Sequence, residues 1–216
     1  MTATEPRSAV APSRANRRAG RRREGTGSVL LTTAAGLVLI IGALCVQSLQ
    51  LGPEARLAPL TYVGAKGEAV DAGRFTARLD SFSTAKSIQS SGKTIGTDGL
   101  FFIINVSAKS SFEPYHLGQP VLLTADGKRF SATDRVDSTL TLSNAWVQPD
   151  IWVSGRFFFE VPASALPEAR VIIALPAKAG LVESFEPEVE VDLGLDEAAA
   201  RKLAASPQDV YSTDKK

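Results

Sequence analysis

The stretch EPYHLGQP, at residues 113–120, holds the side chains of this 216-residue chain that come nearest to a catalytic set. Its only histidine, His116, follows Tyr115. A histidine can act as general base for a serine nucleophile, which would make the protein a hydrolase. The chain has no G-x-S-x-G nucleophile elbow. We therefore favour a plain loop histidine and expect no catalytic residue.

Both tryptophans lie in the stretch SNAWVQPDIWVSG, at residues 143–155. If Trp146 and Trp152 are exposed, they form an aromatic platform with Tyr115 and His116 that suits a sugar ring or a protein partner. Alternatively, one or both rings cover the end of the hydrophobic core. We favour the second interpretation, which large exposure of both rings would overturn. These four residues are the candidate binding surface.

Metal and cofactor sites find little support. The chain contains an acidic run whose carboxylates could bind calcium: Glu183, Glu186, Glu188, Glu190 and Asp192. Their alternation with valines instead indicates the solvated face of a strand, where charge also protects a sheet edge from aggregation. Cys45 is the only cysteine, which excludes an intrachain disulfide and a cysteine zinc site. We expect neither metal nor cofactor.

The elements that must position these loops are strands, because apolar and polar residues alternate with a period of two. In GLFFIINVSA (residues 99–108) both faces are largely apolar, which predicts a central strand. Asp126-Gly127 predicts a tight hairpin between strands 121–124 and 129–132. Further strands are expected in RFTARLDSF, STLTLS (138–143), SGRFFFEVP, ARVIIAL and EVEVDLGL. We predict an all-β fold, an immunoglobulin-like antiparallel sandwich.

The N-terminal region predicts a membrane anchor. Residues 1–28 carry seven arginines and two glutamates, a net charge of +5, which leaves −4 for the rest of a chain of net +1. Residues 29–46 carry no charge, and ten of these eighteen are Leu, Ile or Val. Basic residues before such a run remain cytoplasmic. A nucleic-acid-binding arm is the alternative for the arginines, and we expect no nucleic acid.

Two other fates of this segment stay open. A cleaved signal peptide would release the domain, although no small-residue cleavage pattern follows the apolar run. Lipid attachment at Cys45 would require a small residue before it, where the chain has Leu44. The predicted parts begin with a disordered basic cytoplasmic tail (1–28) and a transmembrane helix in the lipid bilayer (29–49). An extracytoplasmic linker follows (50–66), in which LAPLTYV can add a first strand. The sandwich (67–195) precedes a short helix with a disordered tail (196–216).

The order of these pieces resembles a known family. GLFFIINVSAKSS, the DGKRF hairpin and VQPDIWVSGRFFFEVP are similar to motifs of a domain-of-unknown-function family that shares the immunoglobulin-like, telokin-like fold of small secreted mycobacterial immunoprotective antigens. The likeness covers residues 66–195, and Asp150 departs from it where the family commonly has glycine. Positions that fit are Asn105, Asp126, Gly127, Phe130, Pro149, Gly155, Phe159, Val161 and Pro162. The resemblance implies the fold and carries no catalytic residue.

We therefore expect a single-pass protein of the plasma membrane in a Gram-positive cell envelope, with its N-terminus cytoplasmic and its sandwich extracellular. Its expected role is binding: recognition of an envelope protein, a wall polymer or a small ligand, or service as a subunit of a membrane complex. An envelope hydrolase and a purely structural spacer are the alternatives from other classes.

Overall fold

The computed structural model describes residues 26–48, 58–90, 92–176 and 185–213. The chain divides into two compact units, Met1–Leu51 and Gly52–Lys216. Most of the predicted basic tail, residues 50–57 of the predicted linker and Glu183 lie outside the described residues. The two units are considered separately.

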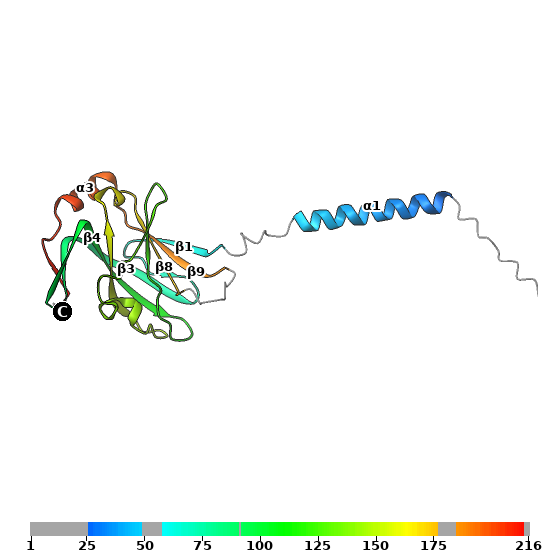
Figure 1. The fold of residues 1–216 in the computed structure, drawn as a ribbon. Helices are drawn as coiled ribbons and strands as arrows, with labels where there is room; N and C mark the ends of the chain where they lie inside the picture. The colour runs from blue at the N-terminus through cyan, green and yellow to red at the C-terminus, as the bar shows by residue number, and fades with distance from the viewer. Residues whose placement is uncertain (1–25, 49–57, 91, 177–184, 214–216) are drawn as a thin grey trace, which may run out of the picture. The chain divides into compact units, whose positions relative to one another are not determined.

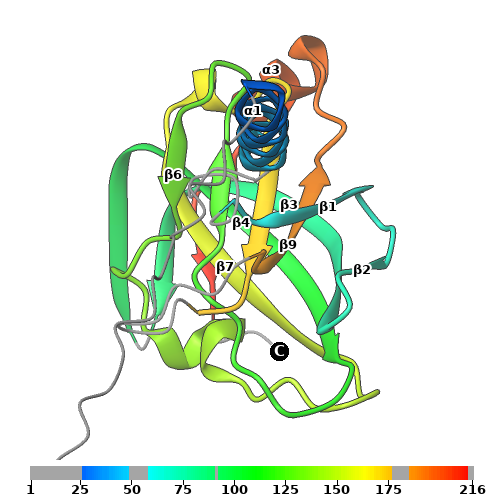
Figure 2. The same ribbon diagram turned by 90° about the vertical axis from the view of Figure 1, so that its right-hand side faces the viewer.

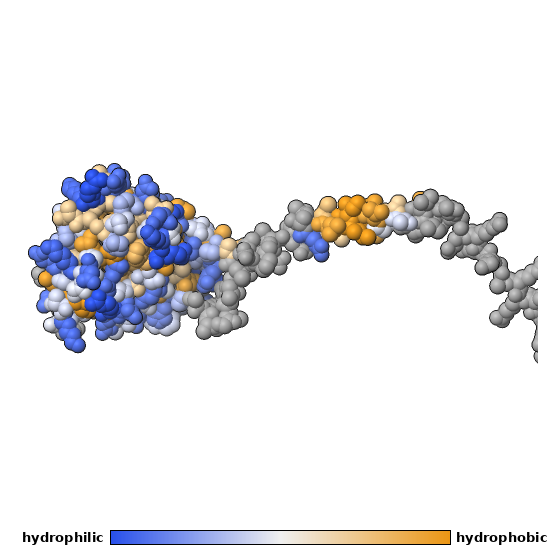
Figure 3. Space-filling model, turned by 45° about the horizontal axis from the view of Figure 1, so that its top comes forward, coloured by the Kyte–Doolittle hydropathy of each residue, from blue (hydrophilic) through white to orange (hydrophobic). Residues whose placement is uncertain are grey.

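The first unit contains helix α1, Thr26–Ser48. It begins three residues before the predicted anchor, so residues 26–28 are helical and do not belong to a disordered tail. Apolar residues cover much of its length in Figure 3. Among the residues that the structure describes, no helix has the combined length and apolar character needed to span a membrane.

The second unit is a β-sandwich, as predicted (Figures 1 and 2). The first sheet follows the order β1 (Leu60–Ala65), β9 (Pro187–Asp192), β8 (Arg170–Ala174), β5 (Val121–Leu123) and β6 (Arg129–Ser131). The second follows the order β10 (Tyr211–Ser212), β3 (Phe75–Ser90), β4 (Lys93–Ser110) and β7 (Val153–Val161), with β2 (Val70–Asp71) paired to β3. Helix α3 (Glu197–Ala205) is the short C-terminal helix expected from the sequence, and Asp196 caps it by accepting a hydrogen bond from the Ala199 amide.

The main core lies between the two sheets and confirms the predicted alternation. Phe102 and Ile104 of β4 and Phe157 and Phe159 of β7 are fully buried there. Valines of β8 and β9 face them from the other sheet. These side chains supply most of the apolar area that folding removes from water.

A second core covers the opposite face of the second sheet. Phe101 and Ile103 of β4 and Phe158 of β7 pack there with Ala85, Ile88 and Val136. The segment after β6 contributes Val136 to this core. The Thr133 amide attaches the same segment to β7 by donating a hydrogen bond to the Phe158 carbonyl at 2.7 Å. β4 is therefore buried on both faces, as its sequence predicts.

The predicted strand at 138–143 is wrong. Two short 3-10 helices, Ser138–Leu140 and Leu142–Asn144, take its place. The Asp137 carboxylate accepts the Thr139 amide and so starts the first of them. Leu140 packs against the second core and Leu142 belongs to the main core, so the alternation reflects two cores and not one sheet.

The purely antiparallel arrangement is also incorrect. Residues 60–65 form the first strand expected from LAPLTYV, but this edge strand pairs in parallel with β9. β10 pairs in parallel with β3, and residues 207–213 of the predicted disordered tail are therefore ordered. The acidic residues of β9 were expected to protect an exposed sheet edge from aggregation. β9 is instead an interior strand, because β1 pairs with it on that side.

The predicted hairpin joins β5 to β6 through Ala125, Asp126 and Gly127. Gly127 has a φ of +81°, a conformation that favours glycine. Asp126 lies 2.7 Å from the Lys128 ammonium and accepts the Thr124 hydroxyl. The hydrogen bonds from Lys128 and Thr124 lower the pKa of Asp126 to about 2.

We expect Asp126→Asn to reduce stability only where the carboxylate is charged. The folded-state pKa is below the ordinary value, so the carboxylate stabilises the fold above about pH 4 and stops doing so as the pH falls through about 2. Solvent screening keeps the effect small. Urea unfolding of both proteins between pH 7 and pH 2 measures it. A difference that is constant across this range would contradict the assignment.

Candidate functional site

The predicted binding residues lie at one end of the sandwich, which we call the entry end because β1 begins there. Leu60 at the start of β1 pairs with Pro187, and Ala174 at the end of β8 pairs with Glu188. The loops after β4 (111–120) and before β7 (145–152) meet at this end, since the Ser110 amide donates to the Gln148 carbonyl.

Backbone pairing holds the two loops together. Tyr115 and Val147 exchange amide-to-carbonyl hydrogen bonds of 3.0 and 2.8 Å, and the Val147 side chain is buried. Further along, the Gly118 amide donates to the Ala174 carbonyl at 2.9 Å. A Cβ at Gly118 would lie 3.1 Å from the Leu175 carbonyl oxygen, so glycine permits this close approach. His116 is therefore fixed between two attached neighbours.

A cavity of about 200 Å³ opens between these loops and the end of β8. The His116 and Trp146 rings form part of its wall, with their centroids 3.9 Å apart and their planes inclined at 44°. Trp146 nevertheless keeps 56% of its surface exposed. The complete lining is Arg74, Pro114, Tyr115, His116, Trp146, Leu175, Pro176 and Glu186. It combines a mostly apolar wall with one cation and one carboxylate.

The cavity has both a polar side chain with a hydrogen-bond partner in the protein and a polar side chain without one. The Tyr115 hydroxyl donates to the Glu113 carboxylate at 2.8 Å. His116 Nδ1 is buried and has no hydrogen-bond partner among the described residues. A catalytic histidine requires a partner at this nitrogen to fix its orientation. The arrangement suits the binding of a ligand better than proton transfer to a nucleophile.

Trp152 lies apart from this cavity. It is 40% exposed, and Arg78 and Lys109 approach its ring to 5.1 and 5.8 Å. Lys109 also lies 3.5 Å from the Asp150 carboxylate. The exposure of both tryptophans favours the platform interpretation over the core-covering one. Only Tyr115, His116 and Trp146, however, share a cavity.

Two functional candidates were not predicted from the sequence. Arg74 precedes β3 and Glu186 precedes β9, and both reach the cavity from segments distant in sequence. No local pattern marks either residue. Glu186 was noted only as part of the acidic run, where it continues the alternation of Glu188, Glu190 and Asp192.

The described part of the acidic run is structural. The Thr61 hydroxyl donates to Glu188 at 2.7 Å, and Glu190 pairs with Arg170 at 2.5 Å. Valines alternate with them into the core, which confirms a polar strand face. Among the described residues, no group of three or more His, Cys, Asp or Glu side chains is placed to hold a metal ion.

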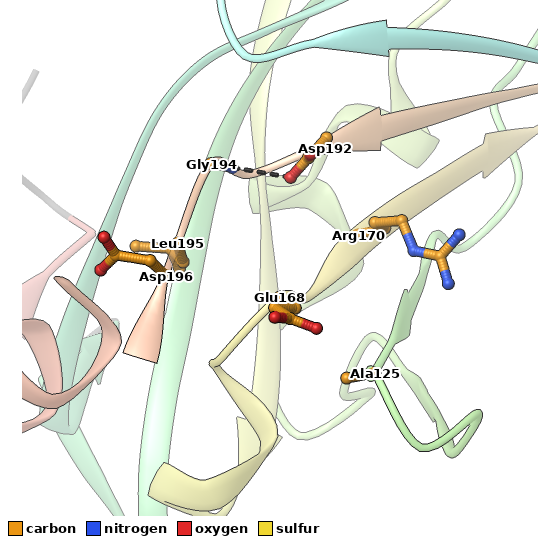
Figure 4. Close-up of a pocket in the computed structure, with 7 residues that line it drawn as sticks. All are labelled: Ala125, Glu168, Arg170, Asp192, Gly194, Leu195 and Asp196. Carbon is orange, nitrogen blue, oxygen red and sulfur yellow. Dashed lines mark hydrogen bonds between the residues drawn. The ribbon is translucent and has the colours of Figure 1, made fainter. Parts of the chain in front are cut away.

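A wider hollow of about 570 Å³ lies at the opposite end of the first sheet (Figure 4). Three of its four charged side chains already have protein partners. Asp192 accepts the Gly194 amide at 2.8 Å, Asp196 caps α3, and Arg170 is paired with Glu190. This hollow is therefore a weaker candidate than the cavity at the entry end.

Comparison with known proteins gives distant structural likenesses. No protein-family model and no curated protein matches the chain. The solved structure of the yjhA protein from Bacillus subtilis is 14% identical, covers 59% of this chain and 99% of its own, and gives a TM-score of 0.45. The secreted protein MPT63 from Mycobacterium tuberculosis is 16% identical, with coverages of 62% and 98% and a TM-score of 0.42.

A third likeness is to an uncharacterised β-sandwich protein from Clostridium difficile 630. It is 12% identical, covers 62% of this chain and 95% of its own, and gives a TM-score of 0.40. One of the three is thus a secreted mycobacterial protein of the kind that the sequence motifs resemble. At these values the likenesses assign neither a family nor a function.

Proposed function

We propose that the protein is a membrane-anchored, extracytoplasmic, immunoglobulin-like sandwich that binds a partner of the cell envelope through the cavity at the entry end. The observation that carries this proposal is the half-exposed Trp146 ring at the wall of that cavity, inclined against His116. An exposed tryptophan over an apolar cavity is a costly surface feature unless a ligand covers it.

The anchor is proposed from the sequence and from the apolar residues of helix α1, although no helix of the described residues meets the length and apolarity of a membrane span. Five consecutive residues of α1, Leu37 to Ile41, are all apolar and each is more than half exposed. At about 100° per residue, five residues pass right around a helix, so apolar side chains point in every direction. A helix that is apolar all round suits a bilayer better than an aqueous surface. The arginines before it orient the N-terminus towards the cytoplasm.

The chemistry of the cavity suits a ring or an apolar side chain that carries polar substituents. The Trp146 face can stack on a sugar ring or pack on an apolar residue. Arg74 and Glu186 can bind a carboxylate or a hydroxyl at its margin. A wall polymer and an envelope protein both offer such groups. The hydrolase alternative is weaker, because His116 Nδ1 lacks an orienting partner among the described residues.

We expect Trp146→Ala to reduce partner capture by about thirtyfold or more, because central aromatic residues of interfaces typically contribute about 2 kcal/mol or more. The partner is trapped in intact cells by a photoreactive amino acid in place of Pro114, which lines the cavity. Capture is compared between this protein and the same protein carrying Trp146→Ala.

The matched control is Trp152→Ala, which removes the other tryptophan and leaves the cavity lining intact. It should retain most of the capture. A second control places the photoreactive residue at Lys128, in the β5–β6 hairpin remote from the cavity, where the same partner should not be trapped. Equal loss in both tryptophan variants, or equal capture from position 128, would refute the assignment.

The location of the full-length chain tests the anchor. A shortened chain found in the medium would support a cleaved signal peptide instead.

A further inference from the structure

The exposed apolar side chains of the sandwich are concentrated at the entry end. Eight large apolar side chains are exposed in the described part of Gly52–Lys216, and six of these lie at that end. They include Phe112, which is 80% exposed, and Ile151, which is 60% exposed. The six residues are Leu60, Phe112, Trp146, Ile151, Trp152 and Phe185. Val63 and Val210 are the two elsewhere.

Backbone contacts place these residues on neighbouring segments. The Leu60 amide donates to the Glu186 carbonyl, which sets Leu60 beside Phe185. The Asp150 amide donates to the Ser110 carbonyl, which sets the segment of Ile151 beside that of Phe112. Glu186 and Trp146 line the same cavity, which connects the two groups. The four segments thus form one end face of the sandwich.

The end face has the chemistry of a membrane–water interface. Tryptophan and phenylalanine with nearby cations are typical of residues at the headgroup level of a bilayer. Arg78 and Lys109 lie near the Trp152 ring. Asp80 and Asp150 are paired with these cations, so no large excess of charge opposes contact with lipid headgroups.

The course of the chain makes the bilayer the best occupant of this face. Residues 49–59, eleven residues, connect the end of α1 at Ser48 to the start of β1 at Leu60. Fully extended, this length reaches about 40 Å. If α1 is the anchor, as proposed above, β1 and the entry end must remain within that distance of the membrane. Such confinement gives even a weak apolar contact a high effective concentration.

We propose that the entry end docks on the outer leaflet of the membrane that holds α1, with Phe112 and Ile151 inserted among the headgroups. The docking rests on the proposed anchor. It identifies the partner of the cavity as one present at the membrane surface, because the cavity opens at the same end.

The two tryptophans provide the test, because the chain has no others and both belong to this end. The full-length protein is placed in lipid nanodiscs at one copy per disc, with bromine-labelled or unlabelled phospholipid acyl chains. Bromine quenches tryptophan fluorescence only at short range. We expect quenching of the wild-type protein by brominated lipid. Its absence at one copy per disc would overturn the proposal.

The decisive variant is Phe112→Ser with Ile151→Ser, which keeps both tryptophans as reporters. We expect its ratio of docked to undocked protein to fall by about tenfold or more, because two large apolar side chains no longer leave water. The matched control, Val63→Ser with Val210→Ser, removes exposed apolar side chains elsewhere and should be quenched like the wild type. Both substitution pairs are at exposed positions, so folding is preserved. Equal quenching of the two double variants would refute the proposal.

Failure of the anchor is recognised separately. If a high-pH wash removes the protein from the discs, α1 does not anchor it in the lipid. Discs are then added to the soluble chain, and quenching by brominated lipid would still support docking, whereas its absence would overturn it. Protein that stays in the discs with unquenched tryptophans would overturn docking alone.

Discussion

Phe158→Ala should reduce the free energy of unfolding by about 3–5 kcal/mol, the usual cost of removing a buried phenylalanine ring. Phe158 is 1% exposed, although it lies on the outer face of the second sheet. It packs against Phe101, Ile103 and Val136, and its ring centroid lies 6.1 Å from that of Tyr211. Urea denaturation of residues 52–216, the compact unit that contains both cores, measures the change.

Phe112→Ala is the matched control, because the same residue type is 80% exposed at that position. It should change the free energy of unfolding by no more than about 0.5 kcal/mol. A loss below about 1 kcal/mol for Phe158→Ala would mean that the second core contributes little. The main core would then hold the sandwich alone.

Removal of residues 207–216 should destabilise the domain by a similar amount, about 3 kcal/mol or more. The deleted segment contributes Tyr211, which packs on Phe158, and exchanges backbone hydrogen bonds with β3. Three of these join Gln208 to Thr84, Lys86 to Gln208 and Thr213 to Gln89. Each hydrogen bond contributes roughly 1 kcal/mol, and the lost ring adds its apolar burial.

Deletion of residues 214–216 alone is the control for the truncation, since β10 ends at Ser212. It should leave the midpoint of the urea transition unchanged. Equal midpoints for the two truncated proteins would show that residues 207–213 do not contribute to the stability of the sandwich. The original expectation of a disordered tail would then be the better description.

The sequence predicts elements whose pattern is local. The β4 strand, the hairpin with Gly127 in its left-handed conformation, and the Asp196 cap of α3 all follow from neighbouring residues. Gly155, one of the motif positions, also has a physical reason. A Cβ there would lie 2.8 Å from the Leu142 Cβ, so the main core leaves no room for a side chain.

The errors arise where distant segments decide the outcome. Alternation in STLTLS looks like a strand because Leu140 and Leu142 serve different cores, which a single sequence does not reveal. β1 and β10 pair in parallel through contacts made more than a hundred residues away. Likewise, Arg74 and Glu186 reach the cavity only because β3 and β9 begin at the same end of the sandwich.

The parallel pairing of β1 with β9 also determines how the domain resists a mechanical load. Force applied through the residues before Leu60, and directed away from the entry end, pulls β1 along its own axis. Six residue pairs join β1 to β9, so this load is shared among them in shear and does not open them one by one. A partner held at the cavity bears mainly on the loops before β3 and β7 and after β4, so tension between partner and tether passes from the second sheet to β1 across the main core.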